Sequence, residues 1–103
     1  MGSPRVKPAA INFVASGDNI VVASSTRPVS VQGVAFTVAG ATNITFKNGS
    51  TAQSGAIQFT GAGASMTLPL SDLVYFFAVP GNDFIINSSQ AVQVSGTLWY
   101  TSG

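Results

Sequence analysis

The residues predict an all-β fold, an antiparallel jelly-roll-like β-sandwich of about eight short strands with an extended N-terminal arm. Apolar and polar residues alternate with a period of two along most of the chain, and hardly any stretch follows the helical period. Turn residues recur at a spacing of roughly 8–12 residues, as in sandwiches and barrels. An immunoglobulin-like sandwich is the alternative, although the chain has no cysteine for the disulfide that such domains usually carry.

We expect two parts, an extended arm over residues 1–10 and a single sandwich domain over residues 11–103. Pro4 and Pro8 each remove a backbone donor and keep the arm away from helical conformations. Arg5 and Lys7 give the arm two of the four positive charges of the chain. We therefore expect the arm to lie along a partner surface.

The expected strands follow one another from residue 11, each bounded by turn residues. Their ranges are 11–13, 20–23, 29–38, 43–47, 56–60, 66–68, 73–79, 84–86 and 91–101. The most apolar of them, residues 73–79, is expected to be the hydrophobic centre of the domain. Asn48-Gly49, directly after the strand 43–47, is the strongest hairpin signal in the chain.

One strand changes its hydrophobic phase in the middle. Val29 and Val31 occupy odd positions of the strand 29–38, whereas the apolar residues after Gly33 occupy even positions. A shift by one residue transfers all following side chains to the opposite face unless the backbone compensates. The pattern predicts a β-bulge, or a bend between sheets, at Gly33.

Charged residues are scarce. They make up 7% of the 103 residues and leave a net charge of +1, whereas globular chains carry about 25%. A disordered chain would be rich in charge and poor in aliphatic residues, which is the opposite of this composition. A folded domain with so little charge has weak self-repulsion, and this favours a protein that works within an assembly.

The residue types argue against catalysis. The chain has no histidine, its three aspartates stand in turn-like sequence, and neither lysine belongs to a nucleophile motif. We therefore expect a protein that is not an enzyme and that uses no cofactor or metal ion. Four basic residues make a poor nucleic-acid footprint, and no apolar run reaches the roughly 20 residues of a membrane-spanning helix. Neither nucleic acid nor membrane is an expected partner.

Three features are typical of a protein-binding surface. Trp99 falls among the polar positions of the last strand, where an aromatic residue is an interface anchor or lies under other residues. Tyr75, Phe76 and Phe77 are consecutive, so a strand cannot turn all three toward one core. The arm is the third feature. The candidate interface residues are Pro4, Arg5, Val6, Lys7, Pro8, Tyr75, Phe77 and Trp99.

The order of these patterns resembles that of short bacteriophage virion proteins of the capsid decoration, or cement, type. The likeness lies in an opening strand and turn (residues 10–22), a central strand (33–40), a strand with its hairpin (43–51) and the closing strand (91–98). The resemblance implies a β-sandwich, commonly a homotrimer, on the outer capsid surface of the virion. Its implied partners are the major capsid protein or other virion proteins, and it implies no catalytic residues.

A carbohydrate- or receptor-binding module of a phage tail or appendage is the alternative function. Such modules often line a groove with aromatic side chains, which Trp99, Tyr100 and Tyr75 would supply. An isolated engineered β-domain is disfavoured, because the surface lacks glutamate and has few lysines.

Overall fold

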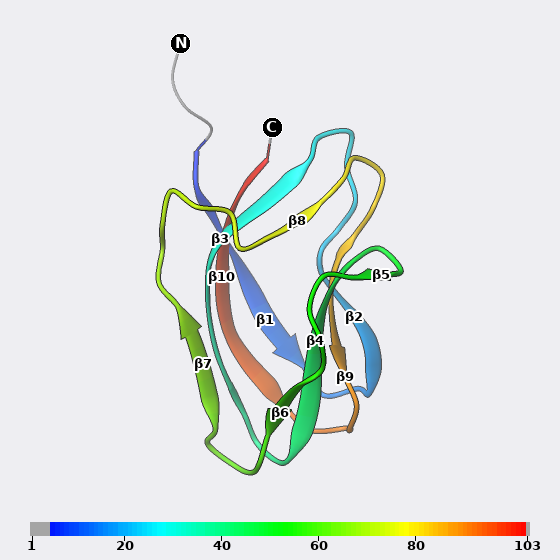
Figure 1. Cartoon of the computed structure of the whole chain (residues 1–103), viewed down its shortest axis with the longest axis vertical. Coiled ribbons are helices and arrows are strands. Elements are labelled where there is room, and N and C mark those ends of the chain that lie inside the picture. The colour runs from blue at the N-terminus through cyan, green and yellow to red at the C-terminus, as the bar shows by residue number, and fades with distance from the viewer. Residues whose placement is uncertain (1–4, 103) are drawn as a thin grey trace.

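The computed structural model of the chain describes residues 5–102. Its ten strands form two antiparallel five-stranded sheets, and no helix occurs in that range. The predicted all-β sandwich is confirmed, and Figure 1 shows the two sheets facing each other. There are ten strands rather than about eight, because each sheet has one interrupted edge made of two short strands.

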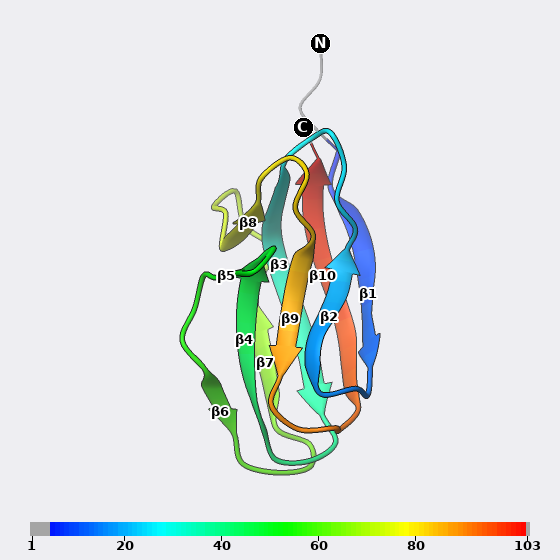
Figure 2. The ribbon, with the colours of Figure 1, turned by 90° about the vertical axis from the view of Figure 1, so that its right-hand side faces the viewer.

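Sheet A has the order β1-β10-β3-β7, with β8 also paired to β3. Its strands are β1 (Lys7–Phe13), β3 (Val29–Val38), β7 (Ser65–Leu68), β8 (Phe76–Ala78) and β10 (Val94–Ser102). Sheet B, which faces the viewer in Figure 2, has the order β2-β9-β4-β5, with β6 also paired to β4. Its strands are β2 (Gly17–Val22), β4 (Thr42–Asn48), β5 (Thr51–Ala52), β6 (Ile57–Phe59) and β9 (Phe84–Ser88).

The expected arm of residues 1–10 is not confirmed. Lys7 pairs with Tyr100 at the start of β1, and the pairing continues to Phe13 opposite Val94. Residues 7–10 are therefore the first half of an edge strand. Pro8 is compatible with this position, because one side of an edge strand needs no hydrogen-bond partner. Pro4 lies outside the described residues.

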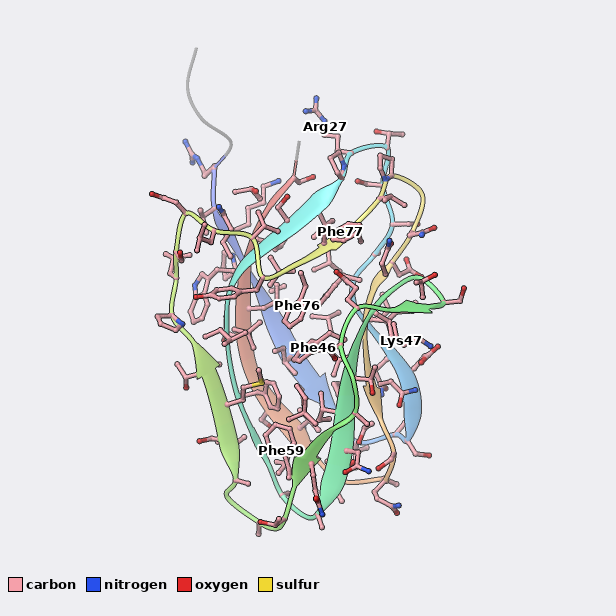
Figure 3. The ribbon with its side chains drawn as sticks, viewed as in Figure 1. Arg27, Phe46, Lys47, Phe59, Phe76 and Phe77 are labelled. Carbon is pink, nitrogen blue, oxygen red and sulfur yellow. The ribbon has the colours of Figure 1, made fainter. Side chains whose placement is uncertain are left out.

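The core is aromatic at its centre. Phe46 of β4 and Phe76 of β8 stack across the two sheets with ring centroids 4.2 Å apart, and Figure 3 shows both rings between the sheets. Phe84 lies beside this pair, with its ring centroid 6.4 Å from that of Phe46 and 6.2 Å from that of Phe76. Around the rings lie aliphatic side chains from both sheets. The fully buried ones include Ile11, Ile44, Ile86, Val31, Val34, Val38, Val94 and Leu98.

The bulge predicted at Gly33 is confirmed. Trp99 pairs with Gly33 but Tyr100 pairs with Val31, so Gln32 is the extra residue of β3. Val29 and Val31 before the bulge, and Val34 after it, are all buried. The extra residue thus keeps both halves of the strand facing the same core despite the phase change in the sequence.

The hairpin predicted at Asn48-Gly49 is also confirmed. Asn48 pairs with Thr51, which leaves a two-residue loop. Gly49 has a φ of 59°, at the first loop position, where a type II′ turn requires a positive φ.

The hairpin also brings Gln53 to the edge of sheet A. The Gln53 carboxamide donates to the Phe77 carbonyl oxygen (2.7 Å) and accepts from the Phe77 amide (2.8 Å). A side chain that follows β5 of sheet B thereby satisfies open backbone groups at the edge of sheet A.

Within residues 5–102 there is no helix long and apolar enough to cross a membrane.

Candidate interaction surface

An exposed apolar surface runs from the end of β7 to the end of β8. We call it the β8 patch and define it by Leu70, Leu73, Val74, Phe77 and Val79. The exposed fraction of these residues ranges from 41% for Val79 to 73% for Leu73. Single exposed apolar residues are ordinary on a protein surface, but several of them in one short segment make that segment a candidate interaction site.

The exposure of the β8 patch contradicts the prediction that residues 73–79 form the hydrophobic centre of the domain. Residues 73–79 were expected to be one strand at the hydrophobic centre, but only Phe76–Ala78 form a strand. In this strand Ala78 is buried and Phe76 stacks on Phe46, while Phe77 faces outward and is 47% exposed. The physical reason is the pleat, which sends successive side chains to opposite faces. Figure 3 shows Phe77 away from the Phe46–Phe76 stack.

The loop between β7 and β8 is tied to the bulge of β3. The Ser71 amide donates to the Gln32 carbonyl oxygen (3.0 Å), and the Tyr75 amide donates to the Val31 carbonyl oxygen (2.9 Å). The Tyr75 hydroxyl donates to the Pro69 carbonyl oxygen (2.8 Å), which closes the loop on itself. The exposed side chains of the β8 patch therefore project from a backbone held at several points.

Trp99 lies half-buried on the outer face of sheet A, between Pro8 of β1 and Gly33 of β3. A Cβ added at Gly33 would lie 3.3 Å from Trp99 Cε3 and 3.2 Å from Leu70 Cα. The absence of a side chain at Gly33 thus allows the indole and the loop to approach the sheet closely. Trp99 continues the β8 patch onto the sheet face.

The candidate residues near the N-terminus reach the same region. Val6, with Gln32, Leu70, Ser71 and Asp72, lines a shallow hollow of about 390 Å³. The structure therefore brings Val6 and Trp99 to the neighbourhood of Leu70, and Pro8 lies opposite Trp99 in the sheet. Arg5 and Lys7 are exposed.

The remaining aromatic candidate, Tyr75, is half-buried beside β3. Tyr100 packs against the core, whereas the neighbouring Trp99 faces outward. Trp99 and Tyr100 do not share a face, so they cannot line one groove with Tyr75.

Asp72 lies within the segment of the β8 patch, whereas the one ion pair among residues 5–102 lies on sheet B. Lys47 Nζ contacts both oxygens of Asp18 at 2.9 and 3.0 Å, and Asn87 Nδ2 donates to Asp18 Oδ1 at 2.7 Å. The hydrogen bonds from Asn87 and from Lys47 lower the pKa of Asp18 below its usual value. This cluster joins β2, β4 and β9 on sheet B, and Lys47 projects from that sheet in Figure 3. In the five strands of sheet A, Lys7 is the one charged residue.

Sequence reasoning missed Leu70, Leu73 and Val74 as surface residues. Pro69 and the polar pair Ser71-Asp72 are turn residues on either side of Leu70 and were the available signal for its exposure. The run 73–79 has no such interruption, so no local pattern marked Leu73 and Val74. Among residues 5–102 no group of three or more His, Cys, Asp or Glu side chains is placed to hold a metal ion.

No known protein family, curated protein or solved structure matches this chain.

Proposed function

We propose that the chain is a non-enzymatic structural protein of a bacteriophage virion that decorates and stabilises the capsid through protein–protein contacts. The observation that carries the proposal is the β8 patch. Its exposed apolar side chains belong to a backbone that is fixed by hydrogen bonds to β3. Such a fixed backbone is typical of a preformed docking surface and distinguishes it from a mobile loop. The location on a phage capsid is proposed from the sequence resemblance to cement proteins.

We also propose that the sandwich is a jelly roll. The strand order supports this, if β5 with β6 and β7 with β8 each count as one interrupted strand, because eight strands then form two sheets of four. Most consecutive strands lie in opposite sheets, beginning with β1 and β2. In an immunoglobulin-like sandwich, by contrast, the first two strands are neighbours in one sheet.

We propose a homotrimer whose contacts include the β8 patch. A closed symmetric assembly covers such a patch on every copy and limits uncontrolled association. The low charge of sheet A supports this, since charged residues are depleted at the centre of interfaces and aromatic residues such as Trp99 are enriched.

Light scattering across a dilution series tests the association. We expect a trimer for the native chain, and dissociation at higher concentration for Leu73→Ser. Burying a leucine side chain contributes about 1.5–3 kcal/mol, so its loss weakens association by at least about tenfold. Ile20→Ser is the matched control, because Ile20 is 61% exposed but belongs to β2 of sheet B.

A monomer at every concentration would contradict the homotrimer. The capsid role is tested by heating particles with and without the chain. We expect particles that lack it, or that carry the Leu73→Ser variant, to release their genome at lower temperature. Equal heat resistance of all particles would contradict the stabilising role.

A further inference from the structure

A second surface feature lies at the end of the sandwich that is distant from the β8 patch. It is an open cavity of about 620 Å³ between the start of β4, β6 and the connection from β9 to β10. This is the lower end in Figures 1 and 2, where β6 lies. The volume is in the range of small-molecule sites in proteins.

The polar residues of the cavity are uncharged. They are Thr42, Asn43, Gln58, Thr60, Ser89 and Gln90. The remaining lining is apolar and consists of Ala41, Ala91, Val92 and Phe59, which is 6% exposed. No charged side chain lines the cavity, so the lining matches a neutral ligand better than an ionic one.

The side-chain amides of the chain divide into two groups. The sequence has eleven Asn and Gln residues. Eight of them make side-chain hydrogen bonds within the protein, namely Asn12, Asn19, Gln32, Asn48, Gln53, Asn82, Asn87 and Gln93. Across residues 5–102 the other three, Asn43, Gln58 and Gln90, make none, and all three line this one cavity.

The backbone beneath these amides is fixed by a buried hydroxyl network. Thr42 Oγ1 and Ser88 Oγ lie 2.8 Å apart, and the backbone amide of Gln90 donates to Thr42 Oγ1 at 3.1 Å. The backbone amide of Asn43 donates to Ser89 Oγ at 2.9 Å. The network positions the backbone of Asn43 and Gln90, so their free carboxamides project from a rigid base.

We infer that this cavity is a binding site for a neutral oligosaccharide. Each carboxamide offers a donor and an acceptor, which is the pairing that neighbouring sugar hydroxyls present in return. The alanine and valine side chains can pack against the apolar C–H face of a sugar ring. The inference goes beyond the proposed capsid role and stands whether or not the chain forms a trimer.

The expected affinity is low for a single site. The cavity is open and has no exposed aromatic ring on which a sugar could stack, so we expect dissociation constants of about 0.1–10 mM. Several copies on one particle would bind a glycan-coated surface far more tightly, because linked sites raise the effective concentration.

The test is an NMR titration of the ¹⁵N-labelled full chain. The probes are neutral gluco-, galacto-, manno- and N-acetylglucosamine-configured oligosaccharides, each raised to about 20 mM, which saturates a low-millimolar site. We expect at least one of them to shift backbone amides at residues 41–43, 58–60 and 89–92. Gln58→Ala, and separately Gln90→Ala, should weaken that response at least tenfold. Gln32→Ala is the control, because its carboxamide contacts the Asp72 carbonyl oxygen away from the cavity.

Four results would overturn the inference. They are the absence of any shift at these residues, an equal response to glycerol at the same concentration, an unchanged affinity of both cavity variants, or tighter binding of a sulfated or carboxylated oligosaccharide than of its neutral parent. The last result would show that charge, and not the free carboxamides, selects the ligand.

Discussion

Gly96 is the glycine whose replacement the structure predicts to be most costly. It lies in β10, where it pairs with Ile11 on one side and Phe36 on the other. A Cβ at this position would fall against the Ala35 carbonyl oxygen, 2.6 Å from Phe36 Cα and 2.7 Å from Phe36 Cβ. These distances are shorter than real Cβ atoms show, and two of the three atoms are backbone.

The neighbouring strand cannot move aside easily. β3 pairs with β10 along one edge and with β7 and β8 along the other, so a displacement would disturb ladders on both sides. Overpacking in a core costs about 1–3 kcal/mol even when side chains adjust. Because backbone atoms must shift here, we expect Gly96→Ala to cost about 3 kcal/mol or more, a large part of the roughly 5–15 kcal/mol that stabilises a small domain.

Urea unfolding measures this loss. With a slope of about 1.5 kcal/mol per M, a loss of 3 kcal/mol lowers the midpoint by about 2 M. Gly55→Ala is the matched control, because a Cβ there meets nothing within 4 Å and the φ of Gly55 is not positive. We expect the control to stay within about 1 kcal/mol of the native chain. A Gly96→Ala midpoint equal to that of the control would refute the close approach of β3 to β10.

Four further substitutions test the core, the ion pair and the hydroxyl network. Phe46→Ala should lower the free energy of unfolding by about 3–5 kcal/mol, while Phe77→Ala, on the exposed face of β8, should cost under about 1 kcal/mol in the same urea assay. Asp18 has a lowered pKa in the folded state, so its contribution is present above the unfolded pKa of about 3.9 and is lost as the pH falls through the folded value. Urea midpoints from pH 6 to 2.5 should therefore fall less steeply for Asp18→Asn. At pH 7 the free energies of unfolding of the native chain and Asp18→Asn should differ by less than about 1 kcal/mol, because the Asp18 side chain is 42% exposed. If the urea midpoints of the two proteins fell in parallel with pH, the lowered pKa of Asp18 would be contradicted. Thr42→Val removes the acceptor of the backbone amide of Gln90 and should lower the free energy of unfolding by about 1–3 kcal/mol. Hydrogen exchange should then show faster exchange at Gln90, and unchanged exchange would contradict the network.

The alternation of apolar residues was sufficient to predict the all-β class and the bulge at Gly33. The pair Asn48-Gly49 was sufficient to predict the hairpin. These features depend on neighbouring residues alone. A phase change in one strand requires an extra residue, and Asn-Gly favours a tight turn through the positive φ that glycine permits.

The sequence also predicted that Tyr75, Phe76 and Phe77 could not share one core, and β8 sends Phe76 inward and Phe77 outward. It placed the whole of residues 73–79 at the hydrophobic centre, however, and there it was wrong. Hydrophobicity indicates which residues favour burial, but how many side chains fit into the core depends on which strands face each other across the two sheets. Phe46, Phe76 and Phe84 fill this part of the core, and Leu73 and Val74 remain outside.

Two features were decided by the tertiary structure alone. Trp99 lies between Pro8 and the Gly33–Leu70 approach, and Val6 lines a hollow with Leu70, only because β1 pairs with β10 and the loop after β7 returns to Gly33. The three cavity amides are 15, 32 and 47 residues apart along the chain, and no local pattern distinguishes Asn43, Gln58 and Gln90 from the eight amides that bond internally. Composition and alternation determine which elements form and which face of each is apolar. The strand pairings bring distant residues together, because they depend on the long-range contacts that fill the core between the two sheets.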